Sequence, residues 1–258
     1  MKNPFMENAA PVDKELAKQQ WEGVRSAFAG AGFTLETIAP VPGLEDMVFS
    51  NNQVFVGTHK SLGPFIVPSR MRYPSRQREV PYYTDWFRAR GYRVIELNYG
   101  DDYLEGHGDL LWDPDFSRVW AGYGVRSTRG GVEKFKSALA ELGIEVVPLE
   151  LSDPRFYHLD TCLAPLAPGS ILIYPGAFTP PALEAIRRNA LRVHEVSLQE
   201  ALRFVCNGVS AHERFITPEL TPGLQVALEK EGLTAIRVPT SEFEKSGGSV
   251  CCLKLFLE

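Results

Sequence analysis

A helix followed by an extended strand recurs five times along this chain, and this repetition constrains the fold more than any other feature. In most copies the helix ends near a glycine, and a segment with apolar side chains at alternating positions follows. The five predicted strands are residues 32–38, 91–97, 143–149, 191–196 and 232–238. Their starts lie roughly 40 to 60 residues apart, a spacing typical of repeated units that close around an axis. An amphipathic stretch at residues 14–29 predicts a further helix before them.

A short polar segment follows each predicted strand, and these five segments hold most of the residues with reactive side chains. They are residues 46–52, 105–109, 158–161, 206–208 and 247–252. If the units close around an axis, equivalent positions converge on one pocket, even from roughly 200 residues apart in sequence. The alternation also suits a doubly wound parallel sheet. The chain shows neither a Gly-rich dinucleotide loop nor a phosphate loop, so an α/β fold without nucleotide binding is favoured.

Charge and composition exclude several classes of partner. The chain has 258 residues, of which 44% are hydrophobic, so it can bury a full core. Its net charge of -5 provides no broad basic surface, and no nucleic acid partner is expected. The first residues lack the apolar run of a signal peptide, and no stretch approaches the ~20 apolar residues that span a bilayer. We therefore expect a cytoplasmic protein with no membrane partner.

The chain ends in a candidate reactive thiol. Gly247 and Gly248 precede the adjacent Cys251 and Cys252, and a predicted apolar strand at residues 253–257 follows. Glycines permit a kinked entry and a strand gives rigid support, which a nucleophile needs. Cysteine is also among the most buried residue types, so the pair fits an inert core equally well. The four cysteines show no CxxC pair, so neither zinc nor disulfides are indicated, and no metal or cofactor is expected.

Potential partners for this thiol stand in the other polar segments. His158 and Asp160 lie two residues apart on a presumed strand, so both side chains would face one ligand. Glu105 and Asp109 could hold a cation or cap a turn. A thiolate that attacks an electrophilic carbon, an imidazole that moves the proton and a carboxylate that orients a cation together form a covalent catalytic site.

The order of these motifs resembles the guanidine-modifying pentein superfamily, which includes dimethylarginine dimethylaminohydrolase, arginine deiminase and the amidinotransferases. The resemblance covers nearly the whole chain and is closest to the dimethylarginine dimethylaminohydrolase branch. It rests on five segments in the family's order: residues 46–49, 105–109, 156–161, 240–248 and 252–255. It implies one pentein domain over residues 1–258, an α/β propeller of five blades with pseudo-five-fold symmetry.

The resemblance also implies roles for individual residues. The family's nucleophile falls on Cys252, its general acid/base histidine on His158, and the carboxylate of its acidic glycine motif on Glu105. Asp160 matches the aspartate that grips the guanidinium in the deiminase and amidinotransferase branches. The dimethylarginine branch does not require an acid there, so the predicted site is a hybrid.

Two departures from the family pattern affect the expected substrate. Asp46 opens the first motif and is expected at the substrate site, but Asn52 stands where the family has a second guanidinium-binding aspartate. An amide brings no charge, so a guanidinium loses one ionic partner, which leaves open a substrate other than a free arginine derivative. The acidic motif also carries an extra residue, His107, which changes the register expected for Glu105.

Two arginines match the family's clamps for a substrate carboxylate. They are Arg76 and Arg126, and a planar guanidinium pairs well with both oxygens of a carboxylate. Arg76 lies in an arginine-rich run, and such runs usually form solvated surface, so Arg126 is the stronger candidate.

The leading hypothesis is therefore hydrolysis of a guanidino or amidino group on a small arginine-like substrate, through a covalent thiouronium on Cys252. Two alternatives stay open: amidino transfer to an amine, and a non-catalytic pentein that binds a small molecule. The sequence does not distinguish hydrolysis from transfer, and a homo-oligomer is compatible with it.

Overall fold

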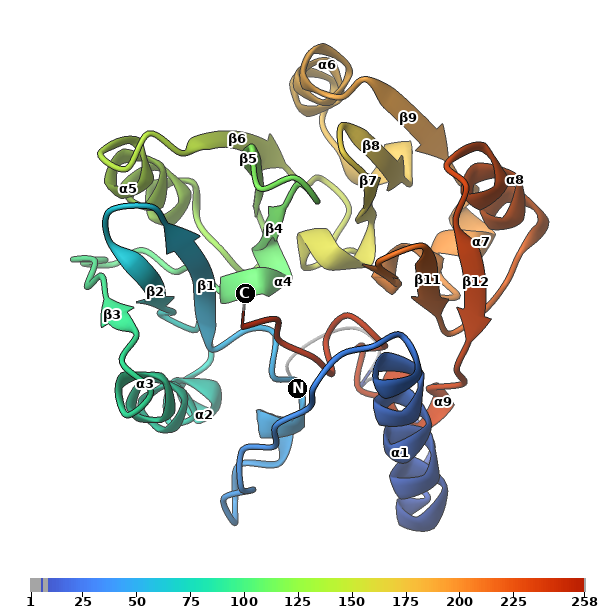
Figure 1. Ribbon diagram of the computed structural model, residues 1–258, viewed down its shortest axis with the longest axis horizontal. Coiled ribbons are helices and arrows are strands. Elements are labelled where there is room, and N and C mark those ends of the chain that lie inside the picture. The colour runs from blue at the N-terminus through green and yellow to red at the C-terminus, as the bar shows by residue number, and fades with distance from the viewer. Residues whose placement is uncertain (1–5, 7–8, 258) are drawn as a thin grey trace.

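Four similar units of a β-hairpin, a helix and a third strand lie around a common centre (Figure 1). The structure is a computed structural model that describes residue 6 and residues 9–257. The first two units are β1 (Val54–His59), β2 (Gly63–Pro68), α3 (Val80–Arg88) and β3 (Arg93–Val94), then β4 (Leu110–Trp112), β5 (Arg118–Tyr123), α5 (Arg129–Ala140) and β6 (Glu145–Glu150). The next two are β7 (Leu163–Ala167), β8 (Ser170–Ile173), α6 (Pro180–Asn189) and β9 (Arg192–Glu195), then β10 (Val209–Ala211), β11 (Arg214–Thr217), α8 (Pro222–Lys230) and β12 (Thr234–Arg237).

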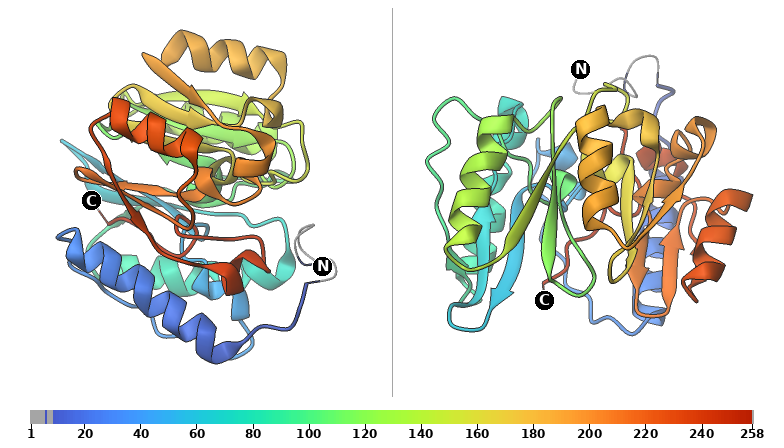
Figure 2. Two further views of the ribbon diagram at one scale, coloured as in Figure 1. Left: turned by 90° about the vertical axis from the view of Figure 1, so that its right-hand side faces the viewer. Right: turned by 90° about the horizontal axis from the view of Figure 1, so that it is seen from above.

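Each unit has the same strand topology. The hairpin is antiparallel, and the third strand returns parallel to the second one after the helix. All four glycines that end the predicted helices, Gly32, Gly91, Gly143 and Gly232, have positive φ, which L-residues with a side chain rarely adopt. The third strand of each unit confirms one predicted strand, so four of the five predicted strands are correct. The four helices lie on the outer side of the ring (Figures 1 and 2).

The fifth sector of the ring contains no regular strand in the described part of the chain. It holds the predicted N-terminal helix, α1 (Lys14–Gly30), together with residues 31–50 and the C-terminal segment. The strands predicted at 32–38 and 253–257 are wrong, because both segments are held by side chains instead of a backbone ladder. The rings of Phe33 and Phe256 pack on each other and on Phe28, and Tyr92 donates a hydrogen bond to the carbonyl of Leu257.

The polar segments carry short helical turns that line the centre of the ring. In the first four segments these turns are η2 (Glu45–Val48), α4 (Gly106–Asp109), η3 (Leu159–Thr161) and η5 (Val205–Asn207), whereas α9 (Ser241–Glu244) ends before the fifth segment begins. The remaining short helices are α2 (Pro74–Gln77), η4 (Pro175–Ala177) and α7 (Leu198–Ala201). No helix among the described residues is long and apolar enough to cross a membrane.

A closed ring of hydrogen bonds links the five polar segments. The carbonyl of Asn51 accepts from the amide of His107, the Asp109 carboxylate accepts from the amide of Leu159, and the carbonyl of Asp160 accepts from the Asn207 side chain. The Asn207 carbonyl accepts from the Cys251 amide, and the Cys252 carbonyl accepts from the Asn51 amide. The predicted convergence of the five segments is therefore confirmed.

Candidate active site

Cys252 lines a pocket at the centre of the ring. The pocket is lined by side chains from all around the ring, including most of those predicted from the sequence. The described lining residues are Met6, Asp46, Phe49, Asn52, Arg76, Arg126, Tyr157, His158, Ser246, Gly248 and Cys252. Glu105 and Asp160 are fully buried and contact this lining from behind.

The Cys252 thiol is held by two buried polar side chains. Its Sγ lies 3.2 Å from Oδ2 of Asp160, and Nδ2 of Asn207 donates to it over 3.3 Å. Burial, followed by the adjacent Asp160 charge, raises the pKa of the Cys252 thiol well above its ordinary value. Cys252 is therefore protonated in this environment, and a cation beside it would favour the thiolate.

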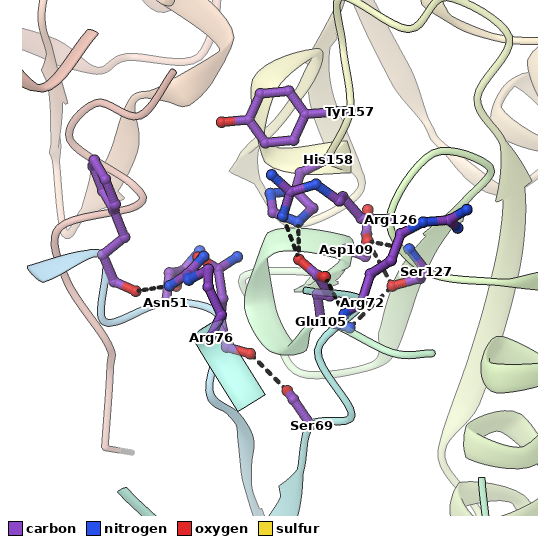
Figure 3. Close-up of polar contacts among 12 residues, drawn as sticks. Asn51, Ser69, Arg72, Arg76, Glu105, Asp109, Arg126, Ser127, Tyr157 and His158 are labelled. Atoms are coloured by element: carbon purple, nitrogen blue, oxygen red, sulfur yellow. Dashed lines mark hydrogen bonds and ion pairs between the residues drawn. The ribbon is translucent and has the colours of Figure 1, made fainter. Parts of the chain in front are cut away.

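Glu105 connects the histidine to an arginine (Figure 3). Its Oε2 lies 2.7 Å from Nε2 of His158 and accepts from Arg126 over 2.9 Å, while Oε1 accepts from the amide of Arg72. Burial opposes ionisation, but Arg126 and His158 hold the pKa of Glu105 well below its usual range. A carboxylate that is ionised at neutral pH therefore orients the His158 ring, despite the extra residue in the acidic motif.

His158 and Asp160 do not lie on a strand, so that prediction is wrong. His158 has extended backbone and precedes the η3 turn, which contains Asp160. A helical turn sends residues two apart in different directions. His158 therefore contacts Glu105, whereas Asp160 contacts Cys252 and Asn51.

Asp109, which the sequence left as either a cation ligand or a turn cap, ties two site segments together. One oxygen accepts from the amide of Leu159, next to His158, and the other accepts from the hydroxyl of Ser127 over 2.6 Å. Figure 3 shows this contact beside Arg126. Asp109 is buried and contacts no pocket surface, so it holds the site's geometry from behind.

The two predicted clamp arginines lie in different surroundings. Arg76 forms a buried ion pair with Glu79 at 3.1 Å, donates to Oδ1 of Asn52 and also donates to two backbone carbonyls. The guanidinium of Arg126 lies between the rings of Tyr73 and Tyr157, 4.8 and 4.7 Å from their centroids. Both arginines reach the pocket, but Arg76 already has most of its donors engaged.

Asn52 has an amide nitrogen without a hydrogen-bond partner among the described residues, although it is buried. A Cβ added to Gly108 would lie 2.2 Å from this nitrogen and 3.1 Å from Nδ1 of His158. The acidic motif therefore needs glycine here, so that its backbone can pass beneath both side chains. Oδ1 of Asp160 likewise has no partner in the described structure, which leaves one donor and one acceptor for a ligand.

His107 and Cys251 lie outside the pocket lining. The Nε2 atom of His107 accepts from the amide of Val56, its ring stacks on Phe55, and burial lowers its pKa to about 3. The extra residue is thus a neutral structural histidine. The Sγ of Cys251 faces Asn51. No group of three metal-ligating side chains is found among residues 6 and 9–257.

A family model described as N,N dimethylarginine dimethylhydrolase, eukaryotic, matches residues 3–256. The chain belongs to this family. It is 36% identical to the dimethylarginine dimethylaminohydrolase of Mycobacterium tuberculosis, over 98% of this chain and 80% of the relative. It is also 36% identical to AgrE, a bifunctional arginine dihydrolase/ornithine cyclodeaminase of Nostoc, but spans only 35% of that protein's length.

Solved structures confirm the pentein-like α/β fold. The N-terminal domain of ArgZ, a cyanobacterial arginine dihydrolase solved with bound substrate, matches with a TM-score of 0.91 and 33% identity over 99% of this chain and 92% of that one. A dimethylarginine dimethylaminohydrolase adduct matches with a TM-score of 0.79 at 20% identity, which supports the fold alone.

Proposed function

We propose that the protein hydrolyses the guanidino group of arginine or an N-methylated arginine through a covalent intermediate on Cys252. The observation that carries this proposal is that Cys252 and His158 line one pocket, with the buried acids Asp160 and Glu105 directly behind them. Relatives with the names dimethylarginine dimethylaminohydrolase and arginine dihydrolase support the same class of substrate.

The first half of the reaction forms a bond between Cys252 and the guanidino carbon. The guanidinium binds near Asp160, and its positive charge offsets the burial that raises the pKa of the thiol. The thiol proton passes to His158, and the thiolate attacks the carbon to give a tetrahedral adduct. His158 then protonates the departing nitrogen, the C–N bond breaks, and an S-alkylthiouronium remains on Cys252.

The second half of the reaction releases the ureido product. His158 removes a proton from water, and the resulting hydroxide attacks the thiouronium carbon. The C–S bond breaks, the electron pair returns to sulfur, and His158 returns a proton to Cys252, while the hydroxyl proton of the O-protonated ureido product passes to solvent. Glu105 keeps the imidazole oriented through both halves, since it contacts Nε2 at 2.7 Å and leaves Nδ1 toward the Gly108 side of the site.

Turnover is expected to rise with pH through the titration of Asp160. Burial raises the pKa of this carboxyl to about 6, so below pH 6 it is protonated and cannot pair with a guanidinium. We expect kcat/KM to increase about tenfold per pH unit below 6 and to level off above it. Asp109 also has a pKa near 6 because of its burial, so Asp160→Asn is needed as the control. If that variant kept the same acidic limb, Asp160 would not be the titrating group.

The proposed function is tested by two assays on the same preparation. Incubation with L-arginine or asymmetric dimethylarginine should release ammonia or dimethylamine together with a ureido product. Intact-mass analysis after 2-chloroacetamidine treatment should show one adduct, mapped to Cys252. Product that forms only when an amine acceptor is added would indicate amidino transfer instead. Neither product nor adduct would indicate a binding protein on this fold.

A further inference from the structure

Lys254 stands two residues after Cys252 but plays no part in the mechanism above. Its Nζ donates to Oδ1 of Asn51 over 3.3 Å and lies 4.8 Å from the ring centroid of Phe256. The side chain is half-buried and does not belong to the pocket lining. Lys254 therefore contacts the site through Asn51 and does not line the pocket.

The Asn51 amide links this lysine to the nucleophile. An ammonium group can only donate, so Oδ1 must face Lys254, which turns Nδ2 toward Oδ2 of Asp160 at 3.3 Å. Nδ2 also donates to the carbonyl of His107 over 2.9 Å, and Asn51 is fully buried. Because the same Asp160 oxygen lies 3.2 Å from Sγ of Cys252, one continuous chain of polar contacts runs from Lys254 to the thiol.

We propose that Lys254 is a positioning residue for the hydrolysis, which acts through Asn51 to keep the Asp160 carboxylate ionised and oriented beside Cys252. This inference rests on the proposed function. The positive charge favours the ionised carboxyl by attraction, and the Asn51 relay holds Oδ2 in place. The Asp160 carboxylate is then already ionised and aligned when a guanidinium binds, so binding requires no reorganisation of this side chain.

Among the described residues, four other titratable groups face Asp160, and of these only Cys252 also favours the ionised carboxyl, through its hydrogen bond. They are Cys252 and Cys251 from the C-terminal segment, Tyr157 before η3 and Cys162 after it. Burial raises the pKa of Asp160, whereas the Cys252 contact, Lys254 and Asn51 oppose this rise. Loss of the lysine charge should therefore push the Asp160 titration upward.

The inference is tested by NMR titration of the Asp160 carboxyl in ¹³C-labelled protein. The Asp160 resonance is identified because it is absent from the spectrum of Asp160→Asn. Lys254→Met and Lys254→Gln should raise the Asp160 pKa by on the order of one pH unit, a tenfold change in the ionisation constant. Lys254→Arg should restore the wild-type value. Lys230→Met, which removes an exposed lysine at the end of α8, should change nothing. An unchanged Asp160 titration in a folded Met or Gln variant would overturn the inference.

A second readout connects this titration to the reaction. Alkylation of Cys252 by cationic 2-chloroacetamidine is compared at pH 6.5 with alkylation by neutral iodoacetamide, which needs no carboxylate partner. The rate with 2-chloroacetamidine divided by the rate with iodoacetamide should fall about three- to tenfold in Lys254→Met and recover in Lys254→Arg. An equal ratio in Lys254→Met would contradict the positioning role. A wild-type Cys252 inert to both reagents would refute the proposed function, while the NMR titration would still decide the Lys254 contact.

Discussion

Replacement of Cys252 by serine is expected to lower kcat for an arginine-like substrate by a factor on the order of 10⁴ or more. A serine hydroxyl has nearly the size of the thiol, but it ionises far less readily in a site that already raises the pKa of Cys252 by burial. The contacts from Asp160 and Asn207 would accommodate a hydroxyl, so binding of substrate should survive. Steady-state kinetics with an equilibrium binding measurement on the same variant would check both parts.

The neighbouring thiol supplies the matched control for this experiment. Cys251 is as buried as Cys252, yet its Sγ faces Asn51 and lies outside the pocket lining. Cys251→Ser should keep turnover within about tenfold of the wild type, since it removes no nucleophile. A Cys251→Ser variant without activity, beside an active Cys252→Ser, would exchange the two assignments.

Glu105→Gln is expected to destabilise the fold by about 3–5 kcal/mol at pH 7, because it leaves the buried Arg126 charge without its ion-pair partner. It should also lower kcat by about 10² or more, since the amide no longer fixes His158 as a carboxylate does. Arg126 and His158 hold the Glu105 pKa below its ordinary range against the effect of burial. The stability difference should thus be full above about pH 5 and shrink as the pH falls.

Urea unfolding from pH 7 down to pH 3, with kcat measured at pH 7, tests this expectation. Glu36→Gln is the control, because Glu36 forms an exposed ion pair with Arg90 at 2.7 Å and should contribute less than about 1 kcal/mol. If Glu105→Gln lowered the free energy of unfolding by no more than Glu36→Gln does, the buried ion pair would contribute no net stability.

Local patterns were enough to predict most of the architecture. Alternating apolar residues, in three cases after a glycine-terminated helix, predicted four strands correctly, because each strand pairs with the second strand of its own unit. The same pattern failed at 32–38 and 253–257, where residues 24–35 pack against the C-terminal segment in the fifth sector. There the packing of Phe28, Phe33 and Phe256 replaces backbone pairing, and no local pattern encodes that choice.

The sequence predicted which residues lie at the candidate site better than it predicted the contacts between them. Cys252 and His158 lie in the predicted pocket because their motifs occupy equivalent positions in repeated units. The link from Asn207 to the thiol and the Lys254 relay were missed, although Asn207 stood in a recognised polar segment. An amide side chain is uncharged, so nothing in the sequence marks it as part of a site. Its role is seen only in the fold, where both its oxygen and its nitrogen have hydrogen-bond partners.

The sequence by itself determined the α/β class, the repeated unit and the set of reactive side chains, because periodicity and residue chemistry are local properties. Only the tertiary structure decided which carboxylate serves which partner. Glu105 faces His158 and Arg126, whereas Asp160 faces Cys252, and these contacts depend on the η3 turn and on ring closure. The protonation of each group follows from burial and from neighbours distant in sequence, so the electrostatics of the site exist only in the folded chain.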